Sequence, residues 1–171
     1  MAYYGDPILR KKAAPVEKIT DEIKTLIADM IETMQDRKGV GLAAPQIHHS
    51  LALFVTQFPD QTNPEEWVPG EVLVFINPKI LEVNDESAYY SEGCLSIPGL
   101  YEEVPRPTKI KITAQDLDGN TFVKELTDYN ARICMHENDH INGVLFIDRL
   151  SPKKKKEIEP LLRTIKKKYA N

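Results

Sequence analysis

The stretch Cys134-Met135-His136-Glu137-Asn138-Asp139-His140 decides how the rest of this chain is interpreted, because it contains the pattern H-E-x-x-H. On a helix, His136 and His140 lie one turn apart on one face, with about 6 Å between their Cβ atoms, so both imidazoles can bind one metal ion. Glu137 then lies about 60° around the helix from His140, and it can reach a water beside the ion without being a ligand. The alternative is a solvated polar turn, because the pattern also arises by chance in charged helices.

The residues that flank this stretch favour the helix. Thr127 or Asp128 can cap its N-terminus, and Asn142-Gly143 supplies a C-terminal stop. The pattern therefore predicts a helix from about residue 128 to residue 142. Cys134 lies roughly 200° around such a helix from His136, so we expect Cys134 to point away from the metal as a small core residue.

Two histidines alone leave a catalytic metal site incomplete, since such sites usually have three protein ligands and one open position. In the longer pattern H-E-x-x-H-x-x-G-x-x-H, the place of the third ligand is taken by Phe146, whose ring cannot bind a metal. Glu157 and Glu159 are available downstream, but they lie in a lysine-rich run typical of a solvated end. The remaining soft ligand is Cys94.

Three separated blocks resemble the signature motifs of the peptide deformylase family, in the family's order and spacing. The blocks are residues 39–46 (GVGLAAPQ), 92–96 (EGCLS) and 136–140 (HENDH). The likeness extends from Gly5 to about Ser151. It implies an α+β fold in which antiparallel β-sheets pack around a central metal-binding helix, with N-terminal and C-terminal helices. We expect residues 1–171 to form a single domain, with residues 151–171 as a basic helical extension.

The resemblance also implies a set of reacting residues. Glu137 would be the general base, and the oxyanion would be stabilised by the Gln46 side-chain amide and the Leu95 backbone N–H. The expected metal ligands are Cys94, His136 and His140. Ligand rules alone favour Zn²⁺ for one thiolate and two imidazoles. The family implies Fe²⁺ as the working metal, with Zn²⁺, Ni²⁺ or Co²⁺ as substitutes.

Further residues are expected to bind the substrate or to position the metal ligands. The resemblance places Gly41 along the bound peptide. Helical geometry puts Tyr129, Arg132 and Ile133 on or near the face of His136, where they should line a pocket for the substrate side chain. Arg106 resembles a family arginine that pairs with Glu92 and steadies the Cys94 loop. The alternative for this pair is two unrelated surface charges.

The activity implied by the resemblance is removal of the formyl group from the formyl-methionine end of nascent peptides, with release of formate. Met135 departs from the family pattern, which usually has glutamine before the first histidine, and Arg132 replaces a more usual apolar residue. Two other functions remain open. One is a metallopeptidase or other acyl-amide hydrolase that uses the same site, and the other is a non-catalytic ribosome-binding module.

Composition is that of an ordinary globular protein, with 171 residues of which 42% are hydrophobic and 28% charged. No apolar run approaches the ~18 residues needed to span a membrane, and the N-terminus lacks the features of a signal peptide. Two cysteines do not make a disulfide framework. We therefore expect a cytoplasmic bacterial protein that binds neither membranes nor specific nucleic-acid sequences.

The C-terminal segment carries a charge opposite to that of the rest of the chain. Residues 151–171 have a net charge of +6, which leaves −10 for the first 150 residues of a chain with net charge −4. Ser151-Pro152 predicts a helix start, and Pro160 should kink or break that helix. The resemblance associates this helix with docking on the ribosome, and a solvated helix is the alternative.

The remaining elements are predicted from periodicity and turn residues. A helix should begin at the cap Thr20, bury an apolar stripe from Ile23 to Met34, and end before Gly39. Strands are expected at residues 51–56 and 72–76, the second ended by Asn77-Pro78, with a long irregular loop that Trp67 pins between them. Residues 91–99 should be irregular, and residues 109–123 should form a hairpin.

Overall fold

The structure is a computed structural model that describes residues 1–60 and 68–169. It contains a five-stranded antiparallel sheet of order β1-β2-β3-β6-β7 and a separate antiparallel hairpin, β4-β5. The strands are β1 (Gly41–Ala43), β2 (Leu53–Pro59), β3 (Pro69–Val83), β4 (Ser87–Cys94), β5 (Ile97–Pro107), β6 (Lys109–Gln115) and β7 (Thr121–Thr127). No helix within the described ranges is long and apolar enough to cross a membrane.

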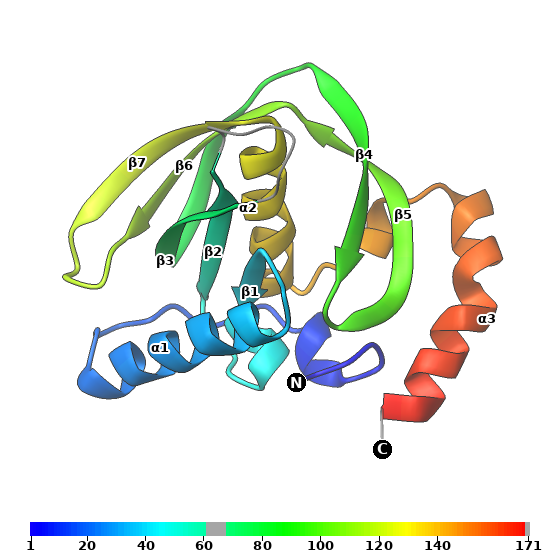
Figure 1. Cartoon of the computed structure of the whole chain (residues 1–171), viewed down its shortest axis with the longest axis horizontal. Helices are drawn as coiled ribbons and strands as arrows, with labels where there is room; N and C mark the ends of the chain where they lie inside the picture. Colours follow the sequence, from blue (N-terminus) through cyan, green and yellow to red (C-terminus); the bar gives the residue numbers. More distant parts are fainter. Residues whose placement is uncertain (61–67, 170–171) are drawn as a thin grey trace.

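The central element is α2 (Asp128–Ile141), which lies between the larger sheet and the hairpin (Figure 1). Its predicted bounds are confirmed, and Thr127 is its N-cap residue, although the Thr127 side chain makes no capping hydrogen bond. Cys134 is fully buried against the larger sheet, as expected for a small core residue. The predicted α+β class, with antiparallel sheets around a central helix, is therefore confirmed.

Two more α-helices flank this centre within the described residues. α1 (Asp21–Asp36) starts at Thr20, whose hydroxyl accepts a hydrogen bond from the Ile23 N–H at 3.4 Å. Its apolar stripe buries Ile27, Met30 and Met34, as predicted. α3 (Pro152–Tyr169) lies on the far side of the hairpin (Figure 1). Three short 3-10 turns complete the fold: η1 (Pro7–Arg10), η2 (Ala44–Ile47) and η3 (Phe146–Arg149).

Buried apolar side chains form three clusters, which we name by their main elements. The sheet core packs α2 against the larger sheet. The hairpin core joins β5, η3, α3 and the N-terminal segment. The α1 core packs α1 against β1 and β2. The sheet core and the α1 core both include residues of β1, and the hairpin core reaches α2 where Phe146 stacks on His136. This junction positions the candidate site.

The prediction that Asn77-Pro78 ends the second strand is wrong, because β3 continues to Val83. Asn77 has a φ of 52°, and the register with β6 shifts between Ile76 and Lys79, so the strand accommodates Pro78 in a bulge. The Asn77 side chain accepts a hydrogen bond from the Val16 N–H and donates one to the Val16 carbonyl, both at 2.8 Å. These two bonds compensate for the interrupted ladder.

Of the kink or break expected at Pro160, the break does not occur, since α3 runs through this residue. A proline inside a helix removes one hydrogen bond to the carbonyl four residues earlier. Ile158, Leu162 and Ile165 on the same helix are buried in the hairpin core. This burial on both sides of Pro160 holds the helix together despite the missing bond.

Residues 91–99 are more regular than the sequence indicates, because they include the end of β4 and the start of β5. Gly93 pairs with Tyr101, and Cys94 pairs with Ile97 across a tight turn. The hairpin predicted for residues 109–123 is confirmed as β6 and β7. The expected long loop is shorter at both ends, since β2 ends at Pro59 and β3 begins at Pro69. The role expected for Trp67 lies outside the described residues.

Candidate metal centre

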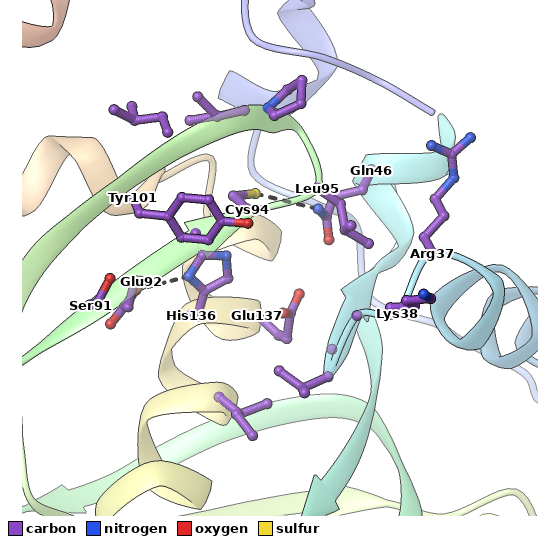
Figure 2. Close-up of a pocket in the computed structure, with 18 of the residues that line it drawn as sticks. Arg37, Lys38, Gln46, Ser91, Glu92, Cys94, Leu95, Tyr101, His136 and Glu137 are labelled. Carbon is purple, nitrogen blue, oxygen red and sulfur yellow. Dashed lines mark hydrogen bonds and ion pairs between the residues drawn. The ribbon is translucent and has the colours of Figure 1, made fainter. Parts of the chain in front are cut away.

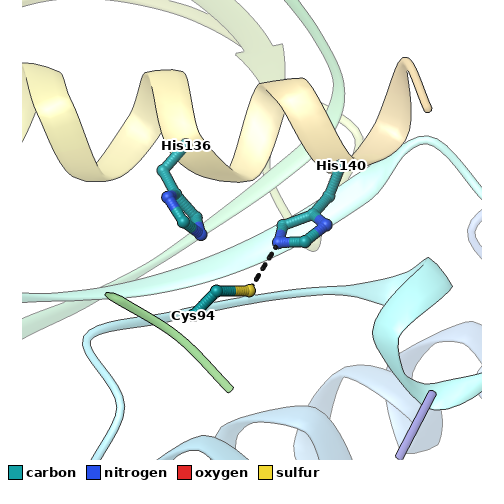
Figure 3. A group of neighbouring side chains, drawn as sticks. All are labelled: Cys94, His136 and His140. Atoms are coloured by element: carbon teal, nitrogen blue, oxygen red, sulfur yellow. Dashed lines mark hydrogen bonds between the residues drawn. The ribbon is translucent and has the colours of Figure 1, made fainter. Parts of the chain in front are cut away.

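Three potential metal ligands converge where the turn of the hairpin meets α2. The ligand atoms of Cys94, His136 and His140 all lie within 4.8 Å of one another, and Cys94 Sγ is 3.2 Å from His140 Nε2 (Figure 3). One thiolate and two imidazoles form a donor set that suits zinc and related transition metals. The residues present therefore fit a single divalent ion with three protein ligands.

The Cys94 sulfur is surrounded by hydrogen-bond donors. The Ser96 backbone N–H points to Sγ at 3.4 Å, and the Gln46 side-chain amide does so at 3.6 Å. The amide of Gln46 is itself fixed, because its oxygen accepts from the Ala43 N–H at 2.9 Å and its nitrogen donates to Ser96 Oγ at 3.1 Å. These contacts fix the position of the Cys94 sulfur beside the two histidines.

Glu92 orients the first histidine from behind. Its carboxylate lies 2.9 Å from His136 Nδ1, which leaves Nε2 of the same ring facing the cluster (Figure 2). Arg106 approaches the same carboxylate with two bonds of 2.6 and 2.8 Å, and Arg132 adds a third at 2.7 Å. Burial would raise the pKa of Glu92, but the bonds to Arg106 and His136 outweigh it and hold that pKa well below its usual range. Glu92 is therefore ionised at neutral pH.

The charged network extends beyond the residues that the sequence singled out. Arg106 is 1% exposed and Glu92 6%, so the interpretation of two unrelated surface charges is wrong. Arg106 also donates to Asp139 at 2.8 Å, and Arg149 binds the same carboxylate at 2.6 and 2.7 Å. Asp139 and Arg149 were missed. A signal for Asp139 was present, since it immediately precedes His140 on a helix that is buried almost all round.

Arg132 lines the cavity as expected, but its guanidinium is not available to a ligand. Besides Glu92 it bonds to the carbonyls of Val104 and Ala88, both at 2.8 Å, and it is 4% exposed. These bonds tie α2 to both strands of the hairpin. Tyr129, one turn earlier on α2, is 45% exposed at the cavity wall.

Glu137 faces the cluster from the same helix and is 4% exposed. Burial raises its pKa to about 7. Its Oε2 atom is buried and has no hydrogen-bond partner among the residues that the structure describes. Gly41 of β1 lies directly against it, so closely that a Cβ atom at position 41 would be 2.4 Å from Glu137 Oε1. The site therefore holds a carboxyl group that can take up and release a proton near neutral pH.

The place of a third histidine is occupied by an aromatic ring that supports the first one. Phe146 is 1% exposed, and its ring stacks on that of His136 with 5.9 Å between centroids. Phe146 thus packs against a ligand instead of acting as one. The two further histidines of the chain, His48 and His49, are exposed and lie outside the cluster.

A cavity of about 620 Å³ opens beside the cluster and brings most of the predicted residues together. Ten of the twelve predicted site residues line it; Arg106 and His140 lie behind its wall. The side chains of Gln46, Cys94, His136 and Glu137 face its interior from three separate elements (Figure 2). This size is typical of a pocket that holds a ligand larger than one amino acid.

Comparisons with known proteins agree on one family. The polypeptide deformylase family model matches residues 1–156. A peptide deformylase of Psychrobacter cryohalolentis is 44% identical over 96% of this chain and 85% of its own length. One from a Thermotoga species is 45% identical over 96% of both chains.

Solved structures give the same result. Arabidopsis thaliana peptide deformylase 1B superimposes with a TM-score of 0.88 at 39% identity, over 98% of this chain and 90% of the plant one. Thermotoga maritima peptide deformylase superimposes with a TM-score of 0.79 at 44% identity, over 88% and 96% of the two chains. Fold, sequence and the geometry of the ligand cluster converge, and the chain belongs to the peptide deformylase family.

Proposed function

We propose that this protein is a metal-dependent hydrolase that removes the N-terminal formyl group from nascent polypeptides that begin with formyl-methionine, releasing formate. The observation that carries the proposal is the buried Glu137 carboxyl group beside the cluster of Cys94, His136 and His140, whose Oε2 atom has no hydrogen-bond partner among the described residues. Family membership supports the reaction class.

Cys94, His136 and His140 would hold the metal ion. When bound, a divalent ion polarises a carbonyl group and makes a water more acidic. We infer Fe²⁺ as the working ion from the family resemblance, with Zn²⁺, Ni²⁺ or Co²⁺ as substitutes. The donor set itself is compatible with all four.

Glu137 is assigned the proton transfers. It accepts a proton from the water that attacks the formyl carbon, and it then delivers that proton to the amine as the carbon–nitrogen bond breaks. A general base works best when its pKa is close to the working pH, and burial raises the pKa of Glu137 to about 7. Gly41 leaves the space into which this carboxyl group fits.

Stabilisation of the oxyanion that develops on the formyl oxygen is assigned to the Gln46 side-chain amide and the Leu95 backbone N–H. The fixed Gln46 amide directs its N–H toward the Cys94 side of the cavity, and Leu95 follows Cys94 in the turn of the hairpin. Loss of one such donor raises the barrier by about 2.7–4 kcal/mol in other enzymes.

The substrate peptide would lie along β1. Within the described residues this strand is at the edge of the larger sheet and pairs with β2 alone, so a peptide could add to its other edge beside Gly41, which lines the cavity. The methionine side chain would occupy the part of the cavity beside Ile133 and Tyr129. Arg132 would not bind the substrate directly, because its donors already bond to Glu92, Val104 and Ala88. We assign it the role of holding this wall of the cavity in position.

The test is formate release from a formyl-Met-Ala-Ser peptide by protein loaded with iron under anaerobic conditions. We expect the unmodified protein to release formate. Glu137→Gln removes the base with little change of shape, so its kcat should be lower by a factor of about 100 to 10,000. Metal content of the variant should equal that of the unmodified protein. A metal-loaded protein that releases no formate would contradict the assignment, and an active Glu137→Gln variant would contradict the role of Glu137.

We also propose ribosome docking through α3 and a cytoplasmic location. Seven exposed lysines flank the buried edge of α3, and the two cysteines are free, which suits a reducing compartment. Cosedimentation with ribosomes that weakens as salt rises would support docking through these charges. Cosedimentation unchanged by glutamine at residues 166–168 would argue against it.

A further inference from the structure

The cavity extends beyond the residues used above, to a rim that carries two unpaired cations. Arg37 and Lys38 line this far end, and both are exposed. Neither forms an ion pair with any residue that the structure describes, whereas the other arginine of the lining, Arg132, is neutralised by Glu92. The lining contains only two carboxylates in the described part of the chain, Glu92 and Glu137, and both are buried.

The two cations are carried by the backbone at the end of α1. Lys38 has a φ of 55°, a left-handed conformation that favours glycine at this position after a helix. The Lys38 N–H bonds to the Gln35 carbonyl and the Gly39 N–H to the Met34 carbonyl, both at 2.9 Å. This pair of bonds is the Schellman arrangement. A lysine thus occupies a position where glycine would fit with less strain, and these bonds fix the backbone that carries its side chain.

Aromatic side chains form the part of the rim next to Arg37. Tyr3 and Tyr169 stack with 4.3 Å between ring centroids, and both line the cavity. Arg37 donates to the Tyr3 hydroxyl at 3.4 Å, which links the cation to this stack. Lys168 lies 5.0 Å from the Tyr169 ring and adds a third positive charge nearby. The far end of the cavity is therefore aromatic and positively charged on a chain with net charge −4.

The direction of the substrate follows from the positions along β1. Glu137 abuts Gly41, and Gln46 bonds to Ala43, so the reacting carbonyl belongs at the C-terminal part of β1. A peptide paired with this edge then leaves toward Gly39 and Lys38. Because an extended chain advances ~3.3 Å per residue, its second and third residues lie ~3–7 Å beyond the methionine, within reach of long cationic side chains.

We propose that Arg37 and Lys38 form a subsite that selects formyl peptides with an acidic side chain at the second or third residue. This selectivity rests on the proposed deformylase function and concerns the peptide beyond the methionine. Each exposed charge pair contributes modestly, so two cations should change kcat/KM by about 2- to 10-fold between acidic and basic peptides.

The experiment measures kcat/KM for a set of formyl peptide amides with the full chain. The set is formyl-Met-Ala-Ser as reference, with Glu or Lys replacing Ala or Ser in turn. C-terminal amides keep the terminal carboxylate from acting as a second anion. We expect the glutamate peptides to exceed the lysine peptides at low salt, and the ratio to fall in 0.5 M salt because screening shortens the range of such interactions.

Variants assign the selectivity to these residues. Arg37→Gln removes one charge, and Lys38→Asn removes the other while keeping a residue that tolerates the left-handed conformation. Each should lower the glutamate-to-lysine ratio, and the double variant should bring it close to one. Lys24→Gln, which removes an exposed charge from the other end of α1, should leave the ratio unchanged.

The outcomes separate the two proposals. Formate released equally from acidic, neutral and basic peptides, or a preference that survives the double variant, would overturn the subsite and leave the deformylase function standing. An absence of formate from every peptide would overturn the function, and the subsite with it.

Discussion

Substitution of Gly41 by alanine should damage the reaction while leaving the fold and the metal ligands in place. The added Cβ atom would lie 2.4 Å from Glu137 Oε1 and 2.8 Å from Cδ and Cγ of the same side chain. Three overlapping atoms of one residue cannot be relieved by a small rotation at its tip. The Glu137 side chain as a whole must therefore retreat.

The magnitude follows from this overlap. Ordinary contacts begin at 3.4 Å, so the carboxylate has to withdraw by about 1.0 Å. A misplacement of ~1 Å in a reacting group costs about 100-fold in rate, or ~2.7 kcal/mol in the barrier. We expect kcat of Gly41→Ala for formyl-Met-Ala-Ser to fall by about that factor, with unchanged metal content.

Two further variants make the measurement decisive. Gly119→Ala, at a φ of 82° in the β6-β7 turn, should reduce the unfolding free energy by about 1–2 kcal/mol and leave kcat unchanged. In a Glu137→Asp background, where the shorter side chain leaves room for the Cβ atom, Gly41→Ala should cost much less than 100-fold. If Gly41→Ala keeps the rate of the unmodified protein, Glu137 does not act from the position described.

Two predictions concern stability. Arg106→Gln leaves Glu92 and Asp139 without their shared buried partner, so the free energy of unfolding measured in urea should fall by about 3–5 kcal/mol. The control Arg10→Gln, at the exposed pair with Asp148, should lower it by at most about 1 kcal/mol. Equal losses in the two variants would refute the importance of burial. Burial alone would raise the pKa of Asp148, but the hydrogen bonds from Arg10 and from a backbone N–H lower it by more. The pKa of Asp148 in the folded state therefore lies below its ordinary value. The stabilisation is then complete above the unfolded-state pKa of ~3.9 and is lost as pH falls through the folded pKa. Asp148→Asn should therefore make unfolding less sensitive to acid below about pH 4, and an unchanged acid profile would contradict this assignment.

The sequence predicts the local parts of the fold well, because these depend on neighbours along the chain. The apolar period of α1, the cap at Thr20 and the turn before β7 each follow from short-range rules and are confirmed. The strand end expected at Asn77 and a helix break at Pro160 do not occur, for the opposite reason. Each breaks a local rule, and each is compensated by distant residues: Asn77 by the backbone of Val16, and Pro160 by burial in the hairpin core.

The candidate site shows the same division. The helix around His136 could be placed from spacing, whereas the partners of Arg132 and Asp139 could not. Arg132 lies on the expected face of α2, yet its long side chain reaches the carbonyls of Val104 and Ala88 on another element. Arg149 is the last residue of the 3-10 turn η3, and nothing in the sequence signals that it binds Asp139. Spacing on a helix predicts the face from which a side chain leaves, whereas its contact partners depend on tertiary packing.

The junction of the three apolar clusters has a consequence for how the protein folds. Cys94 is packed at the edge of the hairpin core, whereas α2, which carries His136 and His140, is anchored in the sheet core. The three side chains come together only when both cores have formed and docked. Metal uptake should therefore report on docking of the two halves, and a bound ion would stabilise the docked state by mass action. The candidate metal centre of this chain therefore also lies where its sheet core and its hairpin core are joined.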